Sequence, residues 1–107
     1  MITEIQRQLA ELIQENSRGS TALFDAEKAL AEAEYALDTA EQKAYIKAQG
    51  TVRDREAIAK LESADLRLAR DLRKAELNRI RQKIKAIETA SMVLATQAKL
   101  MQQESRL

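Results

Sequence analysis

Apolar residues recur at alternating spacings of three and four along most of this chain, a pattern typical of amphipathic helices. The pattern is most regular in the first half, at Leu23, Ala26, Leu30, Ala33, Leu37, Ala40 and Ala44. Leucine at one core position and alanine at the other indicate a coiled-coil seam. Because alanine adds little bulk between two backbones, we expect a second helix to pack closely against this segment.

Two groups of helix-breaking residues divide the chain. In the first, at residues 16–20, Gly19 can end one helix and Ser20 can cap the next. The second is centred on Gly50 and is followed by a capping box that begins at Thr51. We therefore predict an all-α protein with a single domain over residues 1–107 and helices at about 3–17, 20–48 and 52–104. Reversal at Gly50 makes the fold a long antiparallel helical hairpin, a coiled coil, with a short N-terminal helix.

Apolar residues after Gly50 predict two further seams. The first consists of Ile58, Leu61, Leu68, Leu72 and Ala75, and the second of Ile80, Ile84, Ile87, Leu94, Ala98 and Met101. The two seams differ in heptad phase, which indicates a stutter in one long helix. We expect residues 52–80 to pack on residues 20–48, and the short first helix to lie near residues 84–101 of the same chain or of a neighbour. Two helices bury little surface, so we also expect a homo-oligomer.

Composition excludes several classes of chemistry. The 107 residues include no His and no Cys, which removes imidazole and thiolate metal ligands and the usual nucleophilic catalysts. We therefore expect no enzyme, no cofactor, no metal site and no small-molecule substrate. No apolar run approaches the length of a membrane span, and the absence of Cys fits a reducing cytoplasm.

Charge is divided unevenly between the halves. Residues 1–50 hold nine acidic and five basic residues, whereas residues 51–107 hold eight acidic and thirteen basic residues. Five of the bases share one face of the predicted third helix, within an arc of about 60°. They are Arg67, Arg70, Lys74, Arg81 and Lys85. Arg53 and Lys60 extend the same face toward the turn. We call the five the basic stripe and expect it to face solvent. A line of cations suits a phosphate backbone, but it also suits a solvated helix face or pairing with the acidic helix 20–48.

The segment Ala44–Ala57, which reads Ala-Tyr-Ile-Lys-Ala-Gln-Gly-Thr-Val-Arg-Asp-Arg-Glu-Ala, joins an alanine-rich acidic helix to a basic one. In this layout the chain resembles small helical bacteriophage proteins and, more loosely, the UvsY-type phage recombination mediators. The resemblance implies an oligomeric accessory protein in the host bacterial cytoplasm that binds single-stranded DNA and helps to load a recombinase. It assigns DNA contacts to Arg53, Arg55, Lys60 and the basic stripe. It assigns oligomerisation to Ile84, Ile87, Leu94, Ala98 and Met101.

A second hypothesis needs no nucleic acid. The same helices are typical of a coiled-coil protein-interaction module, such as a phage inhibitor of a host factor or an assembly adaptor. Under this hypothesis exposed apolar residues such as Phe24 or Val93 contact the partner.

Overall fold

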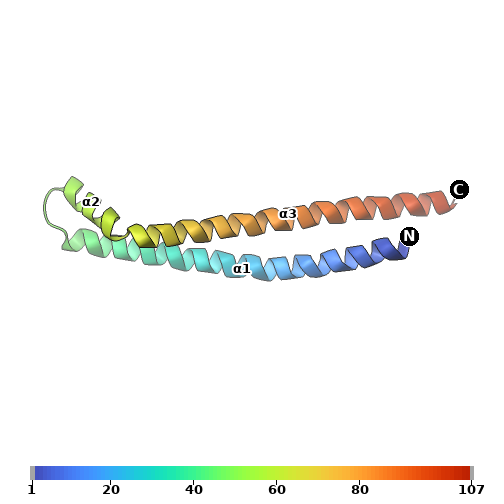
Figure 1. Cartoon of the computed structure of the whole chain (residues 1–107), viewed down its shortest axis with the longest axis horizontal. Coiled ribbons are helices and arrows are strands. Elements are labelled where there is room, and N and C mark those ends of the chain that lie inside the picture. The colour runs from blue at the N-terminus through green and yellow to red at the C-terminus, as the bar shows by residue number, and fades with distance from the viewer. Residues whose placement is uncertain (1, 107) are drawn as a thin grey trace. The chain divides into compact units, whose positions relative to one another are not determined.

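The computed structural model describes residues 2–106 and consists of three helices, drawn in Figure 1. They are α1 (Ile2–Lys47), α2 (Val52–Glu62) and α3 (Ala64–Arg106). The described residues contain no strand, and the chain reverses between α1 and α2. The predicted all-α class and helical hairpin are confirmed.

The helices form two compact units. One, which we call the turn unit, comprises residues 25–78, and the other, the terminal unit, comprises the residues up to 24 and from 79 onwards. In both, α1 runs antiparallel to the returning chain. In the turn unit Tyr45 meets Arg55 and Glu41 meets Arg67, whereas in the terminal unit Gly19 lies against Ile84.

The turn itself follows the expected chemistry. Gly50 has a φ of 113°, a backbone conformation that favours glycine. Thr51 then caps α2, because its hydroxyl accepts a hydrogen bond of 3.2 Å from the backbone N–H of Asp54. The predicted reversal is confirmed, and so is the half of the capping box in which the Thr51 hydroxyl accepts from the backbone N–H of Asp54.

The predicted break at residues 16–20 is wrong, because α1 continues through it without interruption. The Ser20 hydroxyl donates 3.2 Å to the carbonyl of Asn16 and so bonds within the helix instead of capping a new one. A Cβ on Gly19 would lie 3.0 Å from Cγ1 of Ile84. The glycine therefore allows a close approach of side chain to backbone and does not end the helix.

The predicted continuous helix over 52–104 is also wrong. It is interrupted at Ser63, which is 1% exposed and caps the C-terminus of α2. The Ser63 hydroxyl donates 2.7 Å to the carbonyl of Ala59, a local bond that competes with regular helix geometry. The short helix of this protein is therefore α2, not an N-terminal segment.

The Leu/Ala seam of α1 faces the interior as predicted. Ala26, Leu37 and Ala44 are buried, and the seam positions between them are half-buried. The seam predicted opposite it is wrong: Ile58, Leu61, Leu68, Leu72 and Ala75 are all exposed.

The inner face of the returning chain is instead built from Ala59, Ser63, Arg67, Arg70 and Leu77. Ser63, Arg70 and Leu77 are spaced seven residues apart. The heptad positions that face α1 are therefore filled partly by polar residues, and they do not include Leu68 or Leu72. Aliphatic stems of arginine can cover apolar surface while the charged group reaches water. This property lets Arg70 lie on the inner face, which was expected to carry Leu68 and Leu72.

In the terminal unit Ile5 and Ile87 are buried, and residues 3–16 pack against the same chain. Arg7 bonds Glu4 and Glu11 at 2.7 Å each. The hydrogen bond that Arg7 donates to the Glu4 carboxylate, followed by the negative charge of Glu11, raises the pKa of the Arg7 guanidinium above its ordinary value.

Candidate functional site

Two members of the basic stripe turn toward the hairpin interior. Arg67 is half-buried, donates 3.2 Å to the Lys60 carbonyl and 3.2 Å to the Ser63 hydroxyl, and lies 4.0 Å from the Glu41 carboxylate. Arg70 is half-buried and bonds Asp71 at 2.9 Å. The prediction that these two residues face solvent is wrong, because the helix phase places them beside the inner face of α3.

Arg55, another residue assigned to DNA, closes the C-terminal end of α1. Its Nε and a terminal nitrogen donate 3.2 Å and 3.0 Å to the Tyr45 carbonyl, and its guanidinium lies 4.3 Å from the Tyr45 ring centroid. The last carbonyls of a helix lack backbone donors and attract cations. Arg55 therefore has a structural role at the turn.

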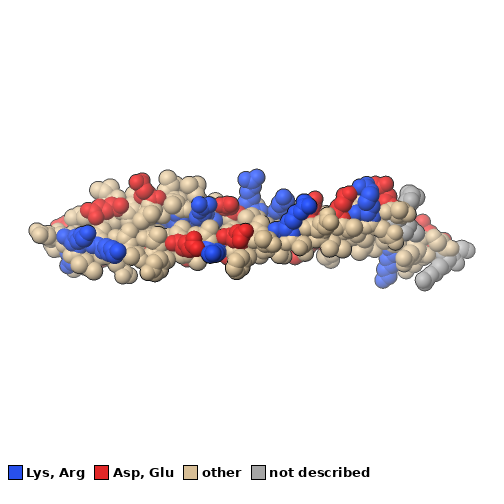
Figure 2. All heavy atoms as spheres, turned by 90° about the horizontal axis from the view of Figure 1, so that it is seen from below, with Lys and Arg blue, Asp and Glu red and all other residues tan. Residues whose placement is uncertain are grey.

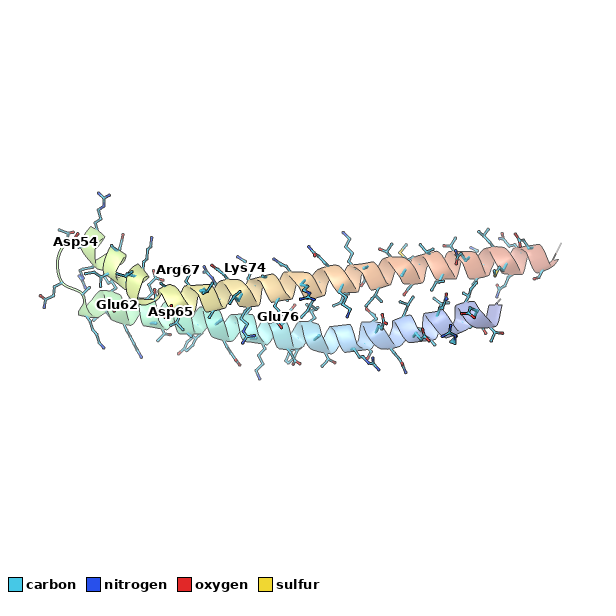
Figure 3. All side chains as sticks on the ribbon, in the orientation of Figure 1. Asp54, Glu62, Asp65, Arg67, Lys74 and Glu76 are labelled. Carbon is cyan, nitrogen blue, oxygen red and sulfur yellow. The ribbon has the colours of Figure 1, made fainter. Side chains whose placement is uncertain are left out.

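The remaining cations are exposed but lie among carboxylates. Figure 3 shows Lys74 in a stretch that also carries Glu62, Asp65 and Glu76, and Figure 2 shows basic and acidic side chains interspersed on the face drawn. In the part of the chain that the structure describes, Lys60, Lys74 and Lys85 form no ion pair, whereas Arg81 does interact within the chain. Arg53 is exposed as well. The stripe is thus divided between two half-buried arginines, Arg67 and Arg70, and three exposed cations, Lys74, Arg81 and Lys85.

The residues assigned to oligomerisation pack within the chain. Ile87 is buried, and Ile84, Leu94, Ala98 and Met101 are half-buried. Grooves along the terminal unit are lined jointly by α3 and α1 residues, such as Met101 with Ile5 and Ile87 with Leu12. These positions therefore supply the core of the terminal unit.

The structure exposes an apolar surface that sequence analysis assigned to the core. Leu61 is 78% exposed, Leu68 59% and Leu72 62%, and we call these three residues the leucine face. On α3, Leu68 projects about 160° around the helix from Arg70, at about 100° per residue. Residues on the inner side of α2 and α3 contact α1, so the leucine face points away from it. The spacing of these leucines by seven and four residues is visible in the sequence, but spacing alone does not show whether they face α1 or solvent.

A groove of about 630 Å³ lies between the C-terminal end of α1 and α2. Its lining combines the Tyr45 and Ile46 side chains with the carboxylates of Asp38, Glu41 and Glu56. Among residues 2–106 there is no group of three or more side chains placed to hold a metal ion, and no helix is long and apolar enough to cross a membrane.

Comparison of the chain with protein-family models, with curated proteins and with solved structures finds no match in any of the three.

Proposed function

We propose that this protein is a helical interaction module that binds another protein chain through the leucine face of its turn unit. The carrying observation is the exposure of Leu61, Leu68 and Leu72 on the side away from α1. Burying one leucine side chain contributes about 1.5–3 kcal/mol, and each of these retains more than half of that surface in water. Exposed apolar patches on soluble chains are typical of protein–protein contacts.

The composition of the hairpin core supports the same proposal. The buried apolar residues of the turn unit are Ala26, Leu37, Ala44, Ala59 and Leu77, of which three are alanines. Its large aliphatic side chains therefore lie mostly outside the core. A second chain that covered them would provide the burial that two helices alone do not.

The experiment places a photo-crosslinking amino acid at position 68 and, as a control, at position 93, where Val93 is 52% exposed on the same helix. The chain is expressed in the cells that make it naturally. We expect position 68, but not 93, to give an adduct with a protein chain, and Leu72→Glu to abolish that adduct. Equal labelling from both positions, or none from 68, would contradict the proposal.

DNA binding remains a second candidate function, supported by the exposed lysines Lys60, Lys74 and Lys85. Contacts through these residues would be to phosphates and strongly salt-dependent. The test is Lys74→Glu with Lys85→Glu, because changes at Arg67 or Arg70 would disturb the hairpin itself. Fluorescence anisotropy with a single-stranded oligonucleotide should show weaker binding for this variant, and an affinity unchanged from the unmodified chain would exclude the lysine contacts.

A further inference from the structure

We propose that the groove between the C-terminal end of α1 and α2 binds a basic, amphipathic segment of a partner chain. The occupant places the aliphatic stem of a lysine or arginine on the apolar part of the groove and its cationic group among the carboxylates. The groove lies within the turn unit, and none of its lining residues belongs to the leucine face. The inference therefore goes beyond the proposed function and does not depend on it.

The groove offers an apolar surface of its own. It measures about 630 Å³, a size within the range of about 300–1,000 Å³ that is common for ligand-binding pockets. Its apolar lining comes from Tyr45, Ile46 and Ala59. Ala59 fills little of the space between the helices because its side chain is short, and Ile46 is 73% exposed. An occupant that covered Ile46 would remove this apolar surface from water, which favours binding.

Charge complementarity identifies the class of occupant. Three carboxylates line the groove, those of Asp38, Glu41 and Glu56, against one ammonium group, that of Lys60. Asp38 belongs to α1 and Glu56 to α2, so a cation bound between the helices has an acidic group on each side. The lining therefore attracts a cationic side chain and repels an anionic one.

The arginine closest to this lining leaves two of the three carboxylates available. Arg67 donates 3.2 Å to the Ser63 hydroxyl and reaches the Glu41 carboxylate only at 4.0 Å. Among residues 2–106, Asp38 and Glu56 take part in no ion pair. These two carboxylates can therefore form charge-assisted hydrogen bonds with a basic side chain from outside.

The pairing of apolar and acidic surface favours a peptide segment over a simple cation. A lysine or arginine has an apolar stem and a charged end, which matches a lining that is apolar at Ile46 and acidic at Asp38 and Glu56. An apolar neighbour in the same segment would cover the rest of Ile46. A polyamine has no such neighbour and would leave that side chain in water.

The test follows the fluorescence of Tyr45 in the full chain. The sequence contains two tyrosines and no tryptophan, so Tyr35→Phe, at a residue that is 75% exposed, leaves Tyr45 as the only tyrosine. The probe is an end-blocked peptide of alternating leucine and arginine, and we expect it to change the emission saturably. Peptides that alternate leucine with glutamate, or serine with arginine, should bind about tenfold more weakly or not at all.

Substitutions in the same background locate the site. Asp38→Asn with Glu56→Gln should weaken binding of the leucine–arginine peptide about tenfold, because both available carboxylates are removed. The matched control is Asp25→Asn with Glu32→Gln, which removes the same charge from exposed positions of α1 outside the groove and should change the affinity less than about twofold. Lys60→Gln removes the cation of the lining and should tighten binding by about threefold. Circular dichroism should show the same helix content in every variant.

Three results would overturn the proposal. The first is the absence of a saturable change in Tyr45 emission, and the second is an equal loss of affinity in the two double variants. The third is equal binding of the serine–arginine peptide or of spermidine, which would show that charge alone is recognised. Leu72→Ser, on the leucine face, should leave the affinity unchanged, and a loss there would place the peptide on that face instead. Adduct formation from position 68 in cells tests the proposed function separately.

Discussion

Arg67 donates a hydrogen bond of 3.2 Å to the hydroxyl of Ser63, one turn earlier, and thereby ties the start of α3 to the break that precedes it. The same guanidinium donates to the Lys60 carbonyl at the end of α2. A cation at this place satisfies a carbonyl that the interrupted helix leaves without a backbone donor. Arg67 thus stabilises the junction between α2 and α3.

Replacing Arg67 with alanine should lower the free energy of unfolding by about 1–3 kcal/mol, because hydrogen bonds contribute roughly 0.5–1.5 kcal/mol each and two are lost. Urea unfolding followed by circular dichroism measures the change. Lys74→Ala is the control, since this exposed lysine forms no ion pair within residues 2–106, and it should stay within about 0.5 kcal/mol. Equal effects of the two substitutions would refute a structural role for Arg67.

Arg55→Lys should destabilise the turn although the charge is kept. Lysine cannot reproduce the two donors that Arg55 directs at the Tyr45 carbonyl, nor the stacking of a planar guanidinium on the ring. We expect a loss of about 1 kcal/mol, seen as a lower Tm in thermal unfolding. Arg53→Lys, two residues away and exposed, should leave Tm unchanged. A similar drop for both variants would mean that the Arg55 contacts contribute nothing specific.

Gly50→Ala should cost about 1–2 kcal/mol, the usual penalty for an L-residue in the left-handed region. The φ of Gly50 is 113°, and an added Cβ would approach the Asp54 carboxylate to 3.2 Å. Guanidinium unfolding of this variant beside Gln49→Ala, the exposed neighbour, checks the prediction. If the glycine variant were as stable as the unmodified chain, the turn would have to adopt another conformation.

Gly19→Ala tests the close contact with Ile84. In an open helix position the change from glycine to alanine stabilises by about 1 kcal/mol, but here the new Cβ would lie 3.0 Å from Ile84 Cγ1. We therefore expect little or no gain in the native background and a gain of about 1 kcal/mol in the Ile84→Ala background. Urea unfolding of the four chains in this double-mutant cycle measures the coupling. If the two substitutions changed the free energy of unfolding additively, Gly19 and Ile84 would not be in tight steric contact.

The fold class, the reversal at Gly50 and the Leu/Ala seam of α1 could be predicted from the sequence, because local spacing and capping chemistry determine them. Helix breaks were less predictable. Gly19 and Ser20 are typical of a break, yet α1 passes through them because Ile84 packs against the glycine and Ser20 bonds back to Asn16. The sequence around Ser63 did not predict the break between α2 and α3. That break depends on the hydrogen bond that the Ser63 hydroxyl donates to Ala59 and on the one that it accepts from Arg67.

The sequence by itself determined that residues after Gly50 form helices with apolar and basic positions at fixed angles around the axis. Only the tertiary structure decided which angle faces α1. Helical periodicity gives the relative directions of side chains but not the rotation of the whole helix against its neighbour. In the packed hairpin the returning helices are rotated so that Ala59, Ser63 and Leu77 are buried. The same rotation directs Arg67 and Arg70 toward α1 and leaves the leucine face exposed to water.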